Sequence, residues 1–590
     1  MHRSPYRTHH CNQLRKSDLG QTVTLSGWVK SRRDHGGVIF VDLGDREGLT
    51  QVVFNPETNK EVAEQAHALR DEFVIRVTGP VVARLTGTEN KNLPTGEIEI
   101  QVASLVVLNP SVALPFPLDG TVENEDLLLT HRYLDLRRPQ LLGNLRTRHQ
   151  ITKTTRRILD DLGFIEVETP ILSKSTPEGA RDFLVPSRLA PGAFYALPQA
   201  PQQYKQLLMV AGLERYYQIA KCFRDEDLRA DRQPEFTQID LEASFITPED
   251  IYAWLEQLMH AVFKETRGID IKDPFLRLSW HDALNTYGSD KPDTRFAVTL
   301  VELTDLFTQS QFKVFRGAVD AGGVVKAINA KGFASITTGQ IEELTNTAKQ
   351  FGAKGLAFIK VENGEWKSPI VKFFSETEKA ELTKRLWIEE GDLILFGADK
   401  WEIVCEVLGR IRLRVAEILK LVVHPDQLNF LWVTDFPLLQ YSAEESKWNA
   451  VHHPFTRPKA EDIPLLEKGE YAKVRAEAYD LVLNGVEVGG GSIRIHEADL
   501  QSKMFSILGV DTEQQQAMFG HLLKAFRFGA PPHGGLALGL DRLVMLVTGA
   551  DSIRDVIAFP KNNRGSDLMS QSPAKVEPKQ LRELHIAIKT

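Results

Sequence analysis

Hydrophobic and polar residues alternate along much of the first hundred positions, which indicates a β-rich N-terminal domain. The period of two is clearest in Phe73–Val77 and Glu97–Val102. About five short strands joined by turns, with one helical stretch near residues 61–70, predict an OB-type barrel within residues 1–109. Such barrels bind single-stranded nucleic acid by stacking bases on aromatic rings beside basic groups.

The pattern changes after a proline-marked stretch, residues 110–142, which we expect to be a hinge. A helical pattern then runs from about Leu141 to Leu162 and stops at Gly163, and Phe164–Leu172 is typical of a strand. Periodicity alone does not separate a helix–strand unit of the core from one that forms a subunit interface.

Residues 289–420 have a composition of their own, rich in Gly, Ala and Val, with separate helix and strand patterns. None of the segments that carry candidate chemistry falls inside this range. We therefore expect an inserted α+β domain that interrupts a catalytic domain made of residues 143–288 and 421–562. Residues 563–590 form a polar C-terminal extension. The whole is predicted to be a multidomain α/β protein.

Composition narrows the class of protein. Of 590 residues, 42% are hydrophobic and 25% charged, which is typical of globular domains. A net charge of −8 argues against a basic protein that coats nucleic acid. The three cysteines, Cys11, Cys222 and Cys405, form no CxxC pair, so we expect no disulfide framework and no zinc site. We find no apolar run of membrane-spanning length and no secretory signal, and expect a cytoplasmic protein.

Two arginines stand where they could meet phosphate. Arg224 follows an apolar strand and precedes a loop dense in charge, and Arg542 opens a helical run after a glycine-rich strand. Guanidinium groups suit polyphosphates and carboxylates. The alternatives are a merely solvated charged loop and an ion pair between Arg542 and Asp541, which the helix dipole disfavours for a cation at a helix N-terminus.

A pair of carboxylates suggests a metal site. Asp480 and Glu487 could lie on two adjacent strands and hold magnesium on the phosphates of a substrate, since hard carboxylate oxygens suit that ion. Gly489, Gly490 and Gly491 follow directly and permit a close approach of the backbone to a ligand.

These segments together resemble a known family. Phe223–Phe236 and Gly535–Arg542 resemble the second and third signature motifs of class II aminoacyl-tRNA synthetases. The resemblance narrows to bacterial-type aspartyl-tRNA synthetases through five further segments and covers nearly the whole chain. These are Gly27–Val29, Thr176–Asp182, Gln202–Lys205, His452–Thr456 and Val488–Arg494.

The resemblance implies a class II antiparallel-sheet core, a homodimer, and ATP-dependent attachment of L-aspartate to tRNA with Mg²⁺. It implies catalytic roles for Arg224 and Arg542. It implies aspartate binding by Glu178, Gln202, Lys205, Arg224, Asp240, His452 and Arg494. It implies ATP binding by Arg224, Asp225, Glu226, Gln233, Glu487, Gly539, Leu540, Asp541 and Arg542.

Within that implied pocket, asparagine would leave Arg494 and Lys205 unpaired, a penalty of roughly several kcal/mol. Two places depart from the family pattern. Ala200 stands where serine is common in the family, and residues 560–567 differ from the usual family sequence.

The N-terminal domain bears on which tRNA is charged. The barrel could bind single-stranded nucleic acid through Arg32, Arg33, Phe40 and Gln51. The resemblance implies that it binds the tRNA anticodon, with His35 and Gly87 near the base that differs between tRNA-Asp and tRNA-Asn. Family members that charge both tRNA-Asp and tRNA-Asn tend to carry histidine and glycine at two of these positions, as here. We therefore expect both tRNAs as partners, with a tRNA-dependent amidotransferase downstream. The alternatives are that His35 is a solvated turn residue and that Phe40 belongs to the barrel core.

Other classes of function remain open at this point. A synthetase specific for tRNA-Asp is the first alternative. A non-catalytic RNA-binding relative would lack its arginine or carboxylate anchors, but Arg224, Glu487, Arg494 and Arg542 are all present. An ammonia-using asparagine synthetase on the same core would need neither the N-terminal barrel nor the long hairpin that the resemblance implies within Phe223–Phe236.

Overall fold

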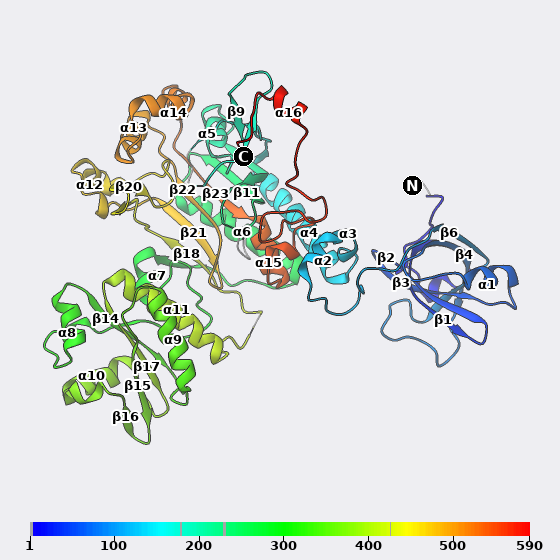
Figure 1. Ribbon diagram of the computed structural model, residues 1–590, viewed down its shortest axis with the longest axis horizontal. Coiled ribbons are helices and arrows are strands. Elements are labelled where there is room, and N and C mark those ends of the chain that lie inside the picture. Colours follow the sequence, from blue (N-terminus) through cyan, green and yellow to red (C-terminus); the bar gives the residue numbers. More distant parts are fainter. Residues whose placement is uncertain (1–3, 177–179, 228–231, 425, 590) are drawn as a thin grey trace. The chain divides into compact units, whose positions relative to one another are not determined.

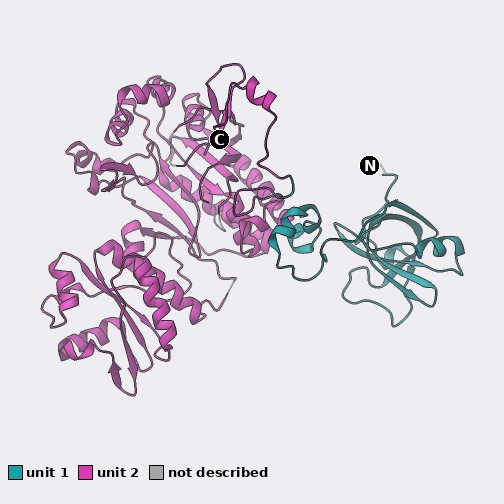
Figure 2. Ribbon diagram, in the orientation of Figure 1, with its two compact units in different colours: residues 1–143, 568–570 teal, residues 144–567, 571–590 magenta. Residues whose placement is uncertain are grey.

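A computed structural model describes the chain except for residues 1–3, 177–179, 228–231, 425 and 590 (Figure 1). The chain divides into two compact units (Figure 2). One contains residues 1–143 with 568–570, and the other contains residues 144–567 with 571–590. Among the described residues, no helix is long and apolar enough to cross a membrane.

The first unit contains a closed barrel. Its strands are β1 (Thr22–His35), β2 (Val38–Asp45), β3 (Gly48–Phe54), β4 (Val74–Ala83), β5 (Ile98–Gln101) and β6 (Ser104–Asn109). They pair in the order β1-β2-β3-β5-β4, β4 pairs back to β1, and β6 extends β4. The alternating inward residues form one hydrophobic core. Five strands thus close the predicted barrel, and the sixth was not expected.

Helices also appear in this unit. Helix α1 (Lys60–Ala66) is shorter than the helical stretch expected near residues 61–70, and Asn59 caps its start. The predicted hinge contains α2 (Glu125–Thr130) and α3 (Arg132–Asp135). In α3 the buried Arg132 donates to Asp135 over 2.7 Å. The segment is therefore folded locally and is more than a linker.

The second unit is built on an eight-stranded sheet of described residues, in the order β12-β18-β21-β22-β23-β11-β10-β7. Its strands are β7 (Ile165–Glu166), β10 (Arg215–Phe223), β11 (Glu235–Ser244), β12 (Leu276–Ser279), β18 (Phe430–Thr434), β21 (Ala478–Leu483), β22 (Val486–Ile493) and β23 (His533–Gly539). The two outermost pairs, β12–β18 and β10–β7, are parallel and the inner pairs are antiparallel. The class II core expected from the sequence is an antiparallel sheet of this kind.

Helices cover this sheet and share its largest hydrophobic core. They are α4 (Pro139–Asp161), α6 (Pro248–Arg267) and α15 (Leu540–Thr548). Helix α4 agrees with the predicted helix, and Gly163 follows it with a φ of +79°. The strand expected over 164–172 shrinks to β7. It lies at the sheet edge with one neighbour, and the proline at 170 has no N–H to continue a ladder.

The range predicted as an insertion has its own sheet, in the order β13-β14-β17-β15-β16. Its strands are β13 (Val301–Glu302), β14 (Val324–Ala330), β15 (Ala357–Glu362), β16 (Glu365–Lys367) and β17 (Leu393–Asp399). Its helices are α8 (Lys313–Asp320), α9 (Thr338–Gln350), α10 (Glu376–Leu386) and α11 (Trp401–Ile418). Two hydrophobic clusters, one with α9 and α11 and one with α8 and α10, give it a core of its own.

Smaller elements complete the unit. The hairpins are β8 (Leu184–Pro186) with β9 (Phe194–Ala196), and β19 (Leu439–Ser442) with β20 (Lys447–Ala450). The remaining α-helices are α5 (Gln202–Val210), α7 (Trp280–Tyr287), α12 (Ile463–Glu467), α13 (Ala498–Ile507), α14 (Thr512–Phe526) and α16 (Pro578–Glu583).

Candidate active site

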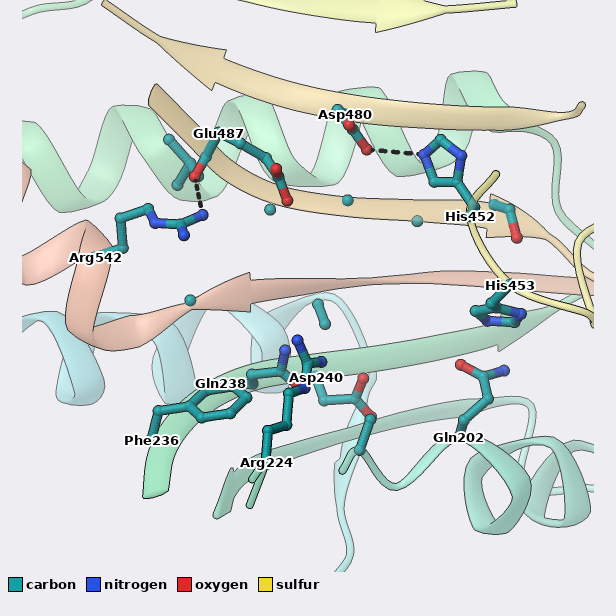
Figure 3. A pocket seen from close by; sticks show the side chains of 18 of the residues that line it. Gln202, Arg224, Phe236, Gln238, Asp240, His452, His453, Asp480, Glu487 and Arg542 are labelled. Carbon is teal, nitrogen blue, oxygen red and sulfur yellow. Dashed lines mark hydrogen bonds and ion pairs between the residues drawn. The ribbon is translucent and has the colours of Figure 1, made fainter. Parts of the chain in front are cut away.

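A cavity of about 600 Å³ lies over the middle strands of the eight-stranded sheet (Figure 3). Most of the sequence-predicted residues line it: Gln202, Lys205, Arg224, Glu226, Gln233, Asp240, His452, Asp480, Glu487, Arg494, Gly539, Asp541 and Arg542. Asp225 and Leu540 do not; Asp225 pairs with Arg181 and Leu540 belongs to the hydrophobic core. Glu178 lies outside the described residues.

Arg224 stands at the bend between β10 and β11. Its backbone N–H donates to the carbonyl oxygen of Pro234 over 2.9 Å, which holds the guanidinium at the cavity. That guanidinium lies 5.0 Å from the ring centre of Phe236, on β11. Its Nε is buried and has no hydrogen-bond partner among the described residues. A buried, unpartnered donor on a permanent cation fits an anionic ligand.

Arg542 lies in the first turn of α15, and its Nη1 donates to the carbonyl oxygen of Glu487 over 2.7 Å (Figure 3). The neighbouring Asp541 does not serve as its salt-bridge partner. Asp541 accepts instead from Arg148 over 2.5 Å and from the backbone N–H of Thr237 over 2.8 Å. These bonds fix the start of α15 against β11.

Gln233 is tied to the segment that departs from the family pattern. Its side-chain oxygen accepts from the backbone N–H of Lys561 over 2.8 Å, and its amide donates to the Lys561 carbonyl over 3.1 Å. Lys561 is therefore tied to a side chain that lines the cavity. Ala200, the other departure, lines it as well.

Asp480 and Glu487 lie on the adjacent strands β21 and β22, as expected. A Cβ built on Gly490 would lie 2.4 Å from the Asp480 carboxylate and 3.9 Å from that of Glu487, so only glycine fits beside the pair. Each carboxylate has a basic neighbour. His452 Nε2 lies 3.3 Å from Asp480 Oδ1, and Lys291 Nζ lies 2.6 Å from Glu487 Oε2.

The protonation of this group follows from burial and pairing. Burial raises the pKa of Asp480. Burial also opposes ionisation of Glu487, but the charge and hydrogen bond of Lys291, together with the charges of Arg542 and His452, outweigh it and lower the pKa of that carboxyl. Burial would lower the pKa of His452, and the nearby Asp480 outweighs it, so that the pKa is raised.

The carboxylate pair fits a magnesium ion shared with a substrate. Mg²⁺ is usually held by one or two carboxylates together with substrate phosphates and water. Asp480 and Glu487 supply two such groups beside an open cavity. The described residues contain no cluster of three or more His, Cys, Asp or Glu side chains that could hold a metal by themselves. Two carboxylates leave the remaining coordination positions of such an ion to substrate oxygens and water.

Four buried charges alternate at the other end of the cavity. Lys205 Nζ lies 2.7 Å from Asp240 Oδ1 and 3.1 Å from Glu242 Oε2. Arg494 donates to both oxygens of Glu242, from Nε over 3.0 Å and from Nη2 over 3.3 Å. All four side chains are at most 3% exposed. Arg494 and Lys205 outweigh burial and lower the pKa of Glu242.

This arrangement corrects one expectation. We expected Lys205 and Arg494 to stand unpaired unless a second substrate carboxylate were present. In the structure Glu242 already pairs with both, because the same cluster holds two cations and two anions. A penalty for unpaired cations therefore does not apply to this pocket.

The cluster nevertheless has hydrogen-bond donors and an acceptor that its own members do not use. Lysine carries three N–H donors and arginine five. Lys205 uses two of them, and Arg494 uses four, the last two on His453 Nε2 and Ser492 Oγ. Within the described ranges, one donor on each cation is thus left over. Asp240 Oδ2 is buried without a hydrogen-bond partner there.

Sequence reasoning missed several of these residues. Glu242 lies two positions after Asp240 on β11, so alternation along the strand could have revealed it. His453 neighbours Arg494, and burial keeps the pKa of His453 well below its ordinary value. Asp290 and Lys291 also line the cavity, although we expected no chemistry inside residues 289–420. That expectation was wrong because these residues precede the inserted sheet, which begins at β13.

The predicted anticodon residues lie in the barrel unit. A polar row crosses β1, β2, β3 and β5: Arg33 donates to Asp42 over 3.0 Å and to Gln51 over 3.3 Å, and Gln51 donates to Glu99 over 2.7 Å. Glu99 was missed, although Glu97–Val102 alternates. Burial raises the pKa of this Glu99 carboxyl.

Two aromatic rings meet beside this row. The ring centres of Phe40 and His35 are 5.8 Å apart in an edge-to-face arrangement, and Phe40 is not part of the barrel core. Arg32 turns toward α1, where its Nε donates to the carbonyl of Ala66. Gly87 lies in an exposed loop with a φ of +88° and open space around it.

Comparisons with known proteins agree with this layout. A family model described as class II tRNA synthetases (D, K and N) matches residues 124–563, and one described as an OB-fold nucleic acid binding domain matches 23–108. The chain is 58% identical to the aspartate--tRNA(Asp/Asn) ligase of Methylacidiphilum infernorum, covering 99% of this chain and 97% of the relative. It is 54% identical to the aspartate--tRNA ligase of Bacillus licheniformis, covering 99% of each.

A solved structure has a similar fold. The asparaginyl-tRNA synthetase from Pyrococcus horikoshii, complexed with asparaginyl-adenylate, superposes with a TM-score of 0.59 over 97% of this chain and 99% of that one. The identity is 20%, so this likeness concerns the fold alone.

Proposed function

Because the chain belongs to the class II tRNA synthetases of the aspartate, lysine and asparagine group, we propose that it attaches L-aspartate to tRNA. The aspartate α-carboxylate attacks the α-phosphorus of ATP, forming aspartyl-adenylate and releasing pyrophosphate. A hydroxyl at the tRNA 3′ end then attacks the activated carbonyl and releases AMP. The observation that carries the proposal is the juxtaposition of fixed arginines with the buried Lys205–Asp240–Glu242–Arg494 cluster in one cavity.

Positioning and charge neutralisation drive the first step, since both reactants are anions. Arg224 holds the α-phosphate and the attacking carboxylate together through its unpartnered Nε and the rest of its guanidinium. Arg542 neutralises the outer phosphates from the first turn of α15. Glu226, Gln233 and the backbone of Gly539 shape the ATP site. No side chain of the protein acts as a nucleophile.

Asp480 and Glu487 would hold magnesium against the ATP phosphates. When bound, the ion supplies positive charge on the phosphate oxygens and eases the departure of pyrophosphate. Gly490 leaves room for the ligand between the two carboxylates.

The amino acid lies across the buried cluster. Asp240 Oδ2 accepts from its ammonium group, and Glu178 is expected to do the same from the family resemblance. The N–H donors of Lys205 and Arg494 that are not used within the cluster donate to the two oxygens of the side-chain carboxylate. Gln202 and His452 line the same pocket and close it. Asparagine would present an amide N–H₂ to one of those donors. Its rejection then comes from a donor facing a donor.

The test of this proposal is ATP–pyrophosphate exchange. Exchange should require aspartate and should not occur with asparagine. A non-catalytic RNA-binding relative gives no exchange at all. An ammonia-using asparagine synthetase exchanges with aspartate but transfers nothing to tRNA, so aspartylation of a tRNA transcript separates the two.

We further propose that both tRNA-Asp and tRNA-Asn are charged. The two anticodons differ in one base, so the barrel must choose. His35 presents a ring nitrogen that can donate to or accept from a base, beside the stacking ring of Phe40. Gly87 leaves the exposed loop without a side chain that could exclude a base. A tRNA-dependent amidotransferase would then convert the mischarged product.

Equal aspartylation assays with tRNA-Asp and tRNA-Asn transcripts decide this point. Comparable charging of both is the expected result. Negligible charging of tRNA-Asn would instead favour a ligase specific for tRNA-Asp.

A homodimer and a cytoplasmic location complete the proposal. Around the edge strand β7, Ile165, Ile171 and Leu172 are each about half exposed, an unusual cost for large apolar side chains unless a partner covers them. Light scattering should give twice the chain mass. The cytoplasm is where ATP and uncharged tRNA are available.

A further inference from the structure

Lys291 lies in the active-site cavity but belongs to none of the sequence motifs described above. It follows the end of α7, and its Nζ is 2.6 Å from Glu487 Oε2. It lines the same cavity as Arg224 and Arg542. Glu487 thus meets two basic side chains: Arg542 at its backbone carbonyl and Lys291 at its carboxylate.

Three contacts fix the backbone on either side of this lysine, two to α11 and one to the turn between β21 and β22. A Cβ on Gly288 would lie 2.5 Å from the Cα of Gly409 on α11, so the two backbones touch. The carbonyl of Asp293 accepts from the buried Arg412, also on α11, over 2.6 Å. A Cβ on Gly485, in the turn between β21 and β22, would lie 3.1 Å from the Asp293 Cβ. The segment is therefore fixed between the inserted domain and the carboxylate-bearing strands.

The lysine side chain itself can move. It is 40% exposed, and the ammonium group sits on a flexible four-carbon stem. Its present partner is one of the two carboxylates that fit magnesium. A lysine ammonium and a metal ion cannot both occupy the same carboxylate oxygen. When the ion takes that oxygen, Lys291 is left beside the phosphates that the ion accompanies.

We propose that Lys291 is an ATP-binding residue that pairs with Glu487 in the empty site and turns onto the outer phosphates when ATP arrives with its metal ion. The lysine thereby supplies Glu487 with a cationic partner in the resting enzyme, as His452 does for the adjacent Asp480. It also adds a positive charge to the triphosphate site beside Arg224 and Arg542. Lys291 lies at the start of the segment that leads into the inserted domain. The same segment therefore carries an ATP-binding side chain and connects to that domain. This inference rests on the proposed function for its ATP part only.

The test uses the full-length protein with Lys291→Met, which keeps the length of the stem and removes the charge. Binding of Mn²⁺ alone, followed by electron paramagnetic resonance of the free ion, should become at least about threefold tighter because the competing ammonium is gone. Binding of Mn²⁺ with a non-hydrolysable ATP analogue should weaken about tenfold, and the KM for ATP in exchange should rise similarly. Lys264→Met, which removes an exposed lysine paired with Asp270, should change neither.

The opposite signs separate this role from structural damage. If Lys291→Met weakens both metal and nucleotide binding, or changes neither, the inference is overturned. Lys291→Gln provides a second neutral variant should the first be poorly folded, and Lys291→Arg should preserve both wild-type affinities within about threefold. If the wild-type protein shows no aspartate-dependent exchange, the proposed function fails. The comparison of Mn²⁺ affinity between wild type and Lys291→Met still reports whether Lys291 competes with the metal ion for Glu487.

Discussion

Asp240 offers the sharpest test of the amino-acid site. Its Oδ1 accepts from Lys205 over 2.7 Å, and its Oδ2 is buried without a partner in the described part of the chain. In Asp240→Asn the amide oxygen would turn to Lys205, because lysine has only donors. The amide N–H₂ would then face the substrate ammonium, which also has only donors.

The magnitude follows from the bond that is lost. A hydrogen bond to a charged group contributes about 1.5–3 kcal/mol, so kcat/KM for aspartate should fall about 10- to 150-fold, before any donor–donor repulsion is added. Most of the change should appear in the KM for aspartate, because the ammonium group does not change charge during the reaction. The KM for ATP should stay within about twofold of the wild-type value.

Aspartate-dependent ATP–pyrophosphate exchange at saturating ATP measures both constants. The matched control is Asp270→Asn, an exposed carboxylate paired with Lys264 on the surface, which should leave kcat/KM unchanged. A kcat/KM for aspartate within about threefold of wild type in Asp240→Asn would refute the reasoning. So would a rise in the KM for ATP as large as that for aspartate.

Three further predictions follow from the same geometry. Burial raises the pKa of Asp240 above 3.8, and only its ionised form accepts the ammonium. The profile of kcat/KM for aspartate against pH should therefore fall on the acid side as pH drops through that raised pKa, and Asp240→Asn should lack this limb. Arg542→Leu should slow exchange at least about 100-fold while calorimetry shows aspartate binding unchanged; a rate within tenfold of wild type would contradict its role. His35→Leu combined with Gly87→Lys should lower aspartylation of tRNA-Asn at least about tenfold relative to tRNA-Asp, and an equal loss on both transcripts would argue against selection by these residues.

Local patterns in the sequence were sufficient for part of the site. The apolar strand before Arg224 and the charged loop after it placed this arginine, and Asp480 and Glu487 lie on adjacent strands as expected. Glu242 was missed because Asp240 alone was taken as a candidate on this strand, whereas β11 continues to Ser244. These misses and successes concern residues close together in sequence.

Contacts between distant segments were beyond sequence reasoning. The pairing of Lys291 with Glu487 spans nearly two hundred positions and depends on how the segment after α7 packs against the turn between β21 and β22. The pairing of Lys205 and Arg494 was also out of reach, because it depends on Glu242 lying between them. Motifs identify which groups face a cavity, but not which groups satisfy one another before a substrate enters.

That distinction decides how the cavity selects its ligand. Its ionic groups largely neutralise one another, so net charge attracts little, and selectivity depends on the atoms that folding leaves unsatisfied. In the described lining these include a donor, Arg224 Nε, and an acceptor, Asp240 Oδ2. Each of these two atoms costs about 1–3 kcal/mol while it is buried without a partner. A ligand recovers both contributions only if it carries an anion for the donor and a cation for the acceptor. An α-amino acid carries its carboxylate and its ammonium group on the same carbon, Cα, whereas ATP alone could satisfy only the arginine. Arg224 is therefore shared between the two ligands, whereas Asp240 Oδ2 is satisfied by the amino acid alone.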